Sequence, residues 1–159
     1  MDEAVAILLT VNGVVVSRRV EPRQSLVDFL RYELELTGSH VGCEHGVCGA
    51  CTVRVDGAIV RGCLMLAVQC DVSRVETIEG VAGTGEMFDL QQAFARENAL
   101  QCGFCTAGIL LTAQDLLVHK PGVSAQEIRE ALSGNYCRCT GYHAIVEAVR
   151  KTAEARAGA

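Results

Sequence analysis

The sequence contains no tryptophan and only two prolines, and aromatic residues make up just 4% of its 159 positions. Half of the residues are nevertheless hydrophobic. Any buried core must therefore be built mainly from aliphatic side chains. A chain of this length is long enough for one ordinary domain or for two small ones.

The sequence also lacks an excess of positive charge, and its formal net charge is −5. This disfavours general nucleic-acid binding, which needs a basic face against the phosphates. No apolar run reaches the roughly 18–20 residues that cross a membrane. The N-terminal stretch Met1-Asp2-Glu3 is acidic and lacks the basic and apolar regions of a secretory signal. We therefore expect a cytoplasmic protein with neither nucleic-acid nor membrane partners.

Cysteine, in contrast, is abundant, with nine residues in the chain. Disulfides are disfavoured in the cytoplasm, and an odd number of cysteines leaves one unpaired. Clustered cysteines in such a chain are more readily explained as metal ligands.

The first half of the chain has the patterns of a β-rich domain. Asn12-Gly13 and Asp56-Gly57 are two-residue hairpin turns. A serine N-cap begins a helix over 25–34, whose apolar residues recur with helical spacing. Alternating apolar residues predict strands at 4–11, 14–20, 52–55 and 58–60, with further possible strands at 64–69 and 74–78.

The composition changes near Gly80, where glycines at 80, 83 and 85 indicate a flexible linker. Helical periodicity follows, and a capping box over 124–127 marks one helix start. Helices are expected at 87–99, 106–119, 124–132 and 142–157. The sequence thus predicts an α+β protein with a β-rich domain over residues 1–79 and a helical domain over residues 80–159.

A first cysteine group has the spacing C-x4-C-x2-C-x11-C, formed by Cys43, Cys48, Cys51 and Cys63. The loop around it is rich in glycine, which permits tight turns around a metal centre and lets backbone N–H groups approach the sulfurs. The first three cysteines have the spacing of plant-type [2Fe–2S] proteins. A zinc site or simple buried cysteines are the alternatives. A Rieske-like ligand role for His45 is disfavoured, because four cysteines already complete the site.

A second group combines a C-x2-C pair, Cys102 and Cys105, with a C-x-C pair, Cys137 and Cys139. Each pair precedes a predicted helix, whose N-terminal N–H groups favour anionic thiolates. By spacing alone, a four-cysteine zinc site competes with an iron–sulfur cluster, and a thioredoxin-like role is weaker because no βαβ pattern surrounds the pair. Cys70 fits neither group and is expected to be a buried apolar residue.

Three long motifs support an interpretation beyond the spacing. They are residues 43–53 (CEHGVCGACTV), 101–108 (QCGFCTAG) and 134–142 (GNYCRCTGY). Together they resemble the small iron–sulfur subunit of the xanthine oxidase family of molybdenum hydroxylases. Similar small subunits occur in carbon monoxide dehydrogenase and in aldehyde or N-heterocycle hydroxylases. The order of the motifs and the chain length also match that subunit.

The resemblance implies a plant-type ferredoxin-like (β-grasp) domain followed by a four-helix bundle domain. It implies two [2Fe–2S] clusters, one on each cysteine group. It also places Gln101 and Cys139 at positions that contact the pterin of the family's molybdenum cofactor. The chain itself is expected to supply no catalytic acid or base.

The resemblance further implies partner subunits. In this family a large subunit carries molybdenum–molybdopterin and a medium subunit usually carries FAD. Electrons would pass from molybdenum through the helical-domain cluster, then through the ferredoxin-like cluster, to FAD, within a dimer of heterotrimers. Two alternatives are a free-standing two-cluster ferredoxin that serves several partners and a zinc-stabilised interaction module.

Overall fold

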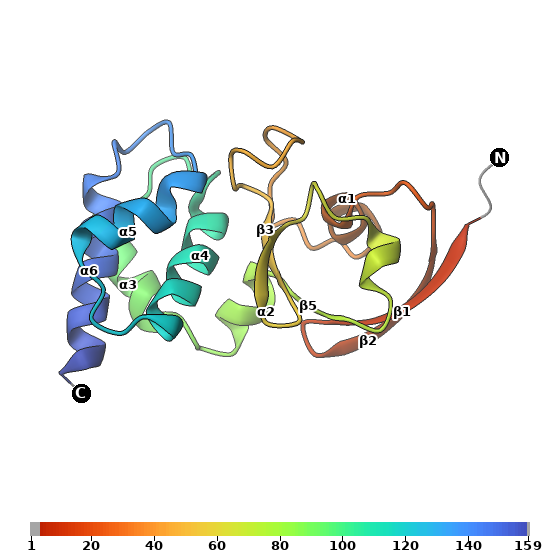
Figure 1. Cartoon of the computed structure of the whole chain (residues 1–159), viewed down its shortest axis with the longest axis horizontal. Coiled ribbons are helices and arrows are strands. Elements are labelled where there is room, and N and C mark those ends of the chain that lie inside the picture. Colours follow the sequence, from red (N-terminus) through yellow and green to blue (C-terminus); the bar gives the residue numbers. More distant parts are fainter. Residues whose placement is uncertain (1–3, 159) are drawn as a thin grey trace.

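The computed structural model describes residues 4–158. The chain forms two lobes that lie side by side (Figure 1). The sheet lobe contains β1 to β5 with the helix α1, and the helical lobe contains α2 to α6. No helix among the described residues is both long and apolar enough to span a membrane.

The sheet lobe is built on one mixed five-stranded sheet with the order β2-β1-β5-β3-β4. The β1–β5 pair is parallel, and the β1–β2, β3–β4 and β3–β5 pairs are antiparallel. The strands are β1 (Val5–Val11), β2 (Val14–Val20), β3 (Thr52–Val55), β4 (Ala58–Arg61) and β5 (Arg74–Glu76).

Both predicted hairpins are confirmed. Asn12 and Gly13 have φ values of 50° and 82°, and Asp56 and Gly57 have φ values of 48° and 84°. Two successive positive φ values match the twist of the flanking strands, which is why Asn-Gly and Asp-Gly suit these turns.

The predicted helix after Ser25 is also present. It begins as α1 (Leu26–Asp28) and continues as a π-helical turn (Phe29–Glu33). Ser25 caps it, because its Oγ accepts the Asp28 N–H at 3.1 Å.

The possible strand at 64–69 is wrong as an extended strand. Leu66 makes only an isolated bridge to Ser25, and a 3₁₀ helix follows at Ala67–Cys70. Ala67 and Cys70 are fully buried. A spacing of three residues between buried side chains fits a 3₁₀ turn rather than the alternation of a strand.

The helical lobe contains the four predicted helices. Its elements are α2 (Ile78–Gly83), α3 (Phe88–Arg96), α4 (Thr106–His119), α5 (Ala125–Ala131), a 3₁₀ turn (Leu132–Gly134) and α6 (His143–Ala157). The helix predicted over 87–99 ends earlier, at Arg96. Two residues later Asn98 takes a positive φ of 53°, which is incompatible with a continuing right-handed helix.

The predicted linker near Gly80 is wrong in its first part, because residues 78–83 form α2. Val81 is buried in the core of the helical lobe. A Cβ placed on Gly80 would lie 2.2 Å from Oδ1 of Asn12. The absence of a side chain at Gly80 therefore permits close packing against the β1–β2 turn, and does not indicate a flexible linker.

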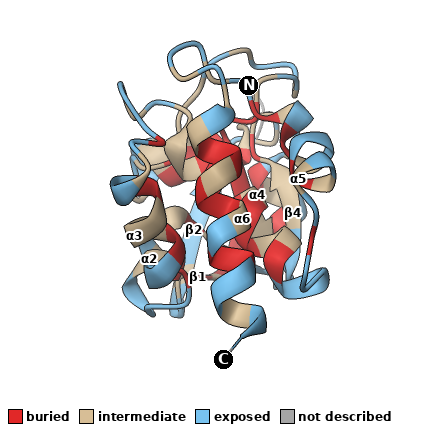
Figure 2. Cartoon of the chain, turned by 90° about the vertical axis from the view of Figure 1, so that its left-hand side faces the viewer, coloured by how far each residue is buried: buried red, intermediate tan, exposed pale blue. Residues whose placement is uncertain are grey.

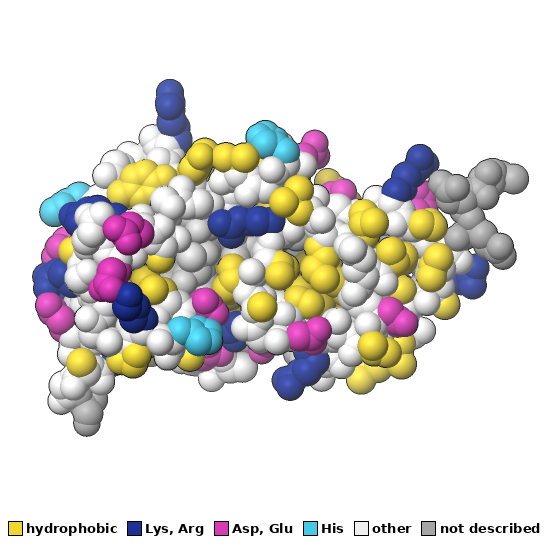
Figure 3. Space-filling model, in the orientation of Figure 1, with side chains coloured by type: hydrophobic (Ala, Val, Ile, Leu, Met, Phe, Trp, Pro, Cys, Tyr) yellow, Lys and Arg dark blue, Asp and Glu magenta, His cyan; other side chains and the backbone are white. Residues whose placement is uncertain are grey.

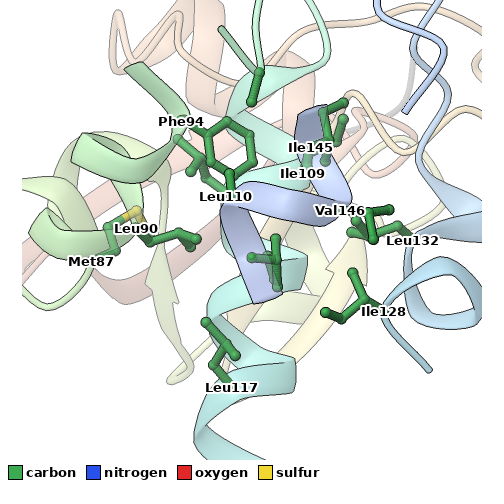
Figure 4. Packing of buried hydrophobic residues seen from close by; sticks show 14 of the residues in the cluster. Met87, Leu90, Phe94, Ile109, Leu110, Leu117, Ile128, Leu132, Ile145 and Val146 are labelled. Carbon is green, nitrogen blue, oxygen red and sulfur yellow. The ribbon is translucent and has the colours of Figure 1, made fainter. Parts of the chain in front are cut away.

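Each lobe has its own hydrophobic core, and both cores are mainly aliphatic, as the composition predicts. In the sheet lobe the core forms between the sheet and the α1 segment. In the helical lobe the buried residues gather on α4 and on the inner face of α6 (Figure 2). Figure 4 shows the main contributors there, which are Met87, Leu90, Phe94, Ile109, Leu110, Leu117, Ile128, Leu132, Ile145 and Val146.

The two lobes meet where α4 lies against β3 and β4. Arg54 of β3 forms ion pairs with Glu76 at 3.4 Å and with Glu86 at 3.0 Å, and only 12% of its side chain is exposed. Glu86 precedes α3, so this ion pair joins the sheet lobe to the helical lobe. Elsewhere, acidic and basic side chains are interspersed on the face drawn in Figure 3.

Candidate metal centres

The first cysteine group lies on the loop that precedes β3 and on the turn that follows β4. Its members approach each other closely. The Cys48 N–H donates to Sγ of Cys43 at 3.4 Å, and the Cys63 N–H donates to Sγ of Cys51 at 3.5 Å. Gly46 has a φ of 82°, so a residue with a Cβ would be strained at this turn of the loop.

Hydrogen bonds and burial shift the thiol pKa values in this group. The backbone N–H groups of Cys48 and His45 lower the pKa of Cys43 to about 6. Burial and the neighbouring Cys63 thiol raise the pKa of Cys51 to about 11, and Cys48 also contributes. Cys48 therefore interacts with both Cys43 and Cys51, and Cys63 interacts with Cys51.

The second group joins the turn before α4 to the turn before α6. Sγ of Cys139 and Sγ of Cys102 are 3.5 Å apart, and both residues are exposed. Cys105 and Cys137 are half-buried. Burial, and then the neighbouring Cys137 thiol, raises the pKa of Cys105 to about 12.

Cys137 differs from its neighbours, because a side-chain hydroxyl contacts its sulfur. Thr140 Oγ1 donates to Sγ of Cys137 at 3.1 Å. Although burial opposes the change, this hydrogen bond lowers the pKa of Cys137. The two pairs predicted to share a site are therefore brought together, and Thr140 was not anticipated from the cysteine spacing.

Gln101 and Cys139, both singled out by the resemblance, are neighbours in space. The Gln101 side-chain amide donates to the Cys139 carbonyl oxygen at 3.2 Å. Both residues are exposed beside Cys102. They therefore form one surface patch next to the second cysteine group.

Direct hydrogen bonds connect the two cysteine groups. The Tyr136 N–H donates to the Cys48 carbonyl at 2.8 Å. The buried Asn135 side chain donates to the Gly49 carbonyl at 3.2 Å. Tyr136 immediately precedes Cys137, so a ligand candidate of one group is one hydrogen bond from the other group.

A second bridge between the groups comes from His40, on the first loop. Its ring stacks on Phe104 with 4.6 Å between centroids, and its Nδ1 lies 2.9 Å from the Phe104 carbonyl oxygen. Phe104 stands between Cys102 and Cys105. Sequence reasoning missed this contact because its two residues are 64 positions apart.

All nine cysteines are free thiols. Cys70 is fully buried in the core of the sheet lobe, as predicted, and burial raises its pKa to about 11. Within residues 4–158, no three His, Cys, Asp or Glu side chains are arranged as a single metal ion requires.

Comparisons with known proteins now identify the family. Residues 9–81 match the model of the 2Fe-2S iron-sulfur cluster binding domain, and residues 77–150 match that of the [2Fe-2S] binding domain. Caffeine dehydrogenase subunit gamma from Pseudomonas sp. (strain CBB1) is 54% identical over 91% of this chain and 88% of its own. The xanthine dehydrogenase iron-sulfur-binding subunit of Escherichia coli O157:H7 is 41% identical over 93% of this chain and 94% of its own.

Among solved structures, quinoline 2-oxidoreductase from Pseudomonas putida 86 contains a chain with a TM-score of 0.88. It is 47% identical, and the match covers 98% of each chain. The chain belongs to the small [2Fe–2S] subunits of the xanthine oxidase family of molybdenum hydroxylases.

As a small subunit of this family, the protein is an electron-transfer component of an oxidoreductase. This confirms the resemblance and favours it over a free-standing ferredoxin. The α+β class, with a ferredoxin-like half and a helical half, is confirmed as well.

Proposed function

We propose that the small subunit relays electrons between a molybdopterin centre on a large subunit and FAD on a medium subunit. In this proposal each group of four cysteines holds one [2Fe–2S] cluster. The first set of ligands is Cys43, Cys48, Cys51 and Cys63, and the second is Cys102, Cys105, Cys137 and Cys139.

The thiols fit such clusters by their chemistry. Iron–sulfur clusters are held by four cysteine thiolates and are tuned by hydrogen bonds to sulfur. Each group supplies four free thiols, and backbone or hydroxyl donors contact three of the sulfurs: those of Cys43, Cys51 and Cys137. When bound, a cluster of this type supplies one-electron redox chemistry, and the chain needs no acid or base for it.

The observation that carries the proposal is the hydrogen bond from the Tyr136 N–H to the Cys48 carbonyl. It joins the two cysteine groups at their inner sides. The outer side of the second group, with Cys102 and Cys139, is open to a partner. The protein therefore has one exposed approach to the second group and a short internal connection to the first.

The exposed approach supports the proposed contact with the pterin. Gln101 and Cys139 would face it, the glutamine through its amide and the cysteine through its backbone. Their mutual hydrogen bond holds both groups in one patch. Leu100 and Phe104, which are 42% and 45% exposed, flank this patch and offer apolar surface to the large subunit.

Further parts of the proposal follow from the family. They include the dimer of heterotrimers, the cytoplasmic location, the four-helix bundle description of the helical half and the domain boundary between residues 79 and 80. The relatives are named for caffeine, xanthine and quinoline. We therefore propose a nitrogen heterocycle as the substrate of the whole complex, recognised by the large subunit.

The first experiment measures iron and acid-labile sulfide in the purified complex and records EPR spectra of the reduced protein. Two distinguishable [2Fe–2S] signals are expected. Cys102→Ser should remove one signal and leave the other, while Cys70→Ala, which alters a cysteine outside both groups, should leave both. Zinc without sulfide, or equal loss of both signals in folded Cys102→Ser, would contradict the ligand assignment.

The relay itself is tested in the complex with its partners. In Cys102→Ser, substrate should still reduce molybdenum but should no longer reduce FAD. Native protein that purifies alone as a 17.0 kDa species, with neither a flavin nor a molybdenum subunit, would contradict the proposed assembly.

A further inference from the structure

The segment between Cys137 and α6 places a hydroxyl group against one sulfur. Thr140 Oγ1 lies 3.1 Å from Sγ of Cys137. The same oxygen accepts the Tyr142 N–H at 3.2 Å. Because an amide can only donate, that contact occupies a lone pair of the hydroxyl and leaves its single hydrogen for the sulfur.

This hydroxyl is held firmly in place. Tyr142 has a positive φ of 69°, a strained conformation for a residue with a Cβ. Its phenolic oxygen accepts the Cys137 N–H at 2.8 Å and donates to the Asn135 carbonyl at 2.9 Å. The ring thus closes the turn from residue 137 to residue 142 and fixes Thr140 beside the sulfur.

The contact is specific to one of the two groups. In the first group the hydrogen bonds to sulfur come from backbone N–H groups. Among residues 4–158, Thr140 is the one residue whose hydroxyl donates to a cysteine sulfur. A substitution that removes it leaves the backbone donors of both groups in place.

A hydrogen bond to a cluster sulfur stabilises the more negative, reduced state and so raises the reduction potential. We propose that the Thr140 hydroxyl raises the reduction potential of the cluster held by Cys102, Cys105, Cys137 and Cys139, and thereby sets how readily that cluster accepts an electron. This inference rests on the proposed ligand assignment. Thr140 acts through Cys137 and is a tuning residue rather than a catalytic one.

The test compares Thr140→Val, which keeps the shape and removes the hydroxyl, with Thr140→Ser, which keeps the hydroxyl. Thr152→Val is the matched control, since the Thr152 hydroxyl donates to the Ala148 carbonyl inside α6. Each variant is prepared in the full complex, and both clusters are titrated with reductant while their EPR signals are recorded separately.

A hydrogen bond to a charged group contributes about 1.5 kcal/mol, which is about a tenfold change in an equilibrium and is the upper limit here, because the sulfur accepts the bond in both oxidation states and only the difference shifts the potential. Thr140→Val should therefore lower the reduced-to-oxidised ratio of the second cluster, relative to that of the first, about three- to tenfold, equivalent to about 30–60 mV for one electron. Thr140→Ser and Thr152→Val should leave this ratio within about twofold of the unmodified protein.

Several results would overturn the inference. One is an unchanged potential in Thr140→Val with both signals present, and another is an equal shift of both clusters. If Thr140→Val and Thr140→Ala both lose the second signal while Thr140→Ser keeps it, the hydroxyl serves assembly and not potential. Failure of the ligand assignment is recognised separately, because the unmodified protein would then lack a second [2Fe–2S] signal.

Discussion

The contact between α4 and the first cysteine loop depends on Gly108. A Cβ placed there would lie 2.1 Å from the Gly49 carbonyl oxygen and 3.2 Å from its carbon. Close carbon–oxygen contacts in proteins are roughly 3.3–3.6 Å, so Gly108→Ala would require a movement of about 1 Å. Both partners are backbone atoms, and no side-chain rotation can relieve the clash. The helix or the loop must move.

The size of the effect follows from two opposing terms. Overpacking in a well-packed contact costs about 1–3 kcal/mol. The higher helix propensity of alanine offsets at most about 1 kcal/mol of this cost. Because both clashing atoms belong to the backbone, we expect a cost at the upper end of that range, so the free energy of unfolding should fall by about 2 kcal/mol. Since α4 begins directly after Cys105, its displacement should also carry part of the second cysteine group away from the first.

The assay for Gly108→Ala is urea unfolding of the cluster-loaded chain, followed by far-UV circular dichroism. In the assembled complex, the rate of FAD reduction by substrate should also fall. The matched control is Gly83→Ala, because a Cβ placed on Gly83 would meet no atom within 4 Å and this glycine ends a helix in an ordinary conformation. The control should be neutral, or more stable by about 0.4–1 kcal/mol.

Equal urea midpoints for Gly108→Ala and Gly83→Ala, with unchanged FAD reduction in both, would refute this reasoning. Such a result would mean that the two lobes adjust freely at this contact. The hydrogen bonds of the same region argue otherwise, since Asn135 and Tyr136 fix the second group onto Gly49 and Cys48.

Two further substitutions each remove a hydroxyl that accepts a hydrogen bond, the first beside the second cysteine group and the second at the start of α5. Tyr142→Phe leaves the half-buried Cys137 N–H without its acceptor. The free energy of unfolding, measured by urea titration, should fall by about 1–3 kcal/mol. An unchanged urea midpoint would show that water replaces the hydroxyl without loss of stability. Ser124→Ala removes the Oγ that accepts the Glu127 N–H at 3.3 Å in the capping box of α5. It should cost about 1 kcal/mol, and amide exchange should rise in α5 and not in α3.

The parts of the fold that the sequence predicts well are those with local causes. The Asn12-Gly13 turn and the capping box at Ser124 act within a few residues, so the elements they define are recognisable without tertiary information. Gly80 shows the opposite case. A side chain at position 80 would clash with Asn12, which lies 68 positions earlier in the sequence. Nothing in the sequence near Gly80 distinguishes a glycine required by such a contact from a glycine in a flexible linker.

The site divides in the same way. The spacing predicts two groups of four cysteines, and in the second group the structure places Sγ of Cys139 3.5 Å from Sγ of Cys102. The residues that join the groups were not predictable, since His40 meets Phe104 and Asn135 meets Gly49 across long stretches of chain. Thr140 is an intermediate case. It lies next to a ligand candidate, but only the turn closed by Tyr142 directs its hydroxyl to the sulfur.

These contacts give the proposed relay an outer and an inner side. Cys102 and Cys139 are exposed, whereas Cys137 is half-buried and is joined through Tyr136 to the Cys48 carbonyl. A partner can therefore approach the second group from outside without disturbing its connection to the first. The tuning hydroxyl of Thr140 acts on the inner sulfur, Cys137, where the electron would leave for the first cluster. Substitutions at the exposed Cys102 and Cys139 should thus affect electron entry into the second cluster. Substitutions around Cys137 should instead affect electron transfer from the second cluster to the first.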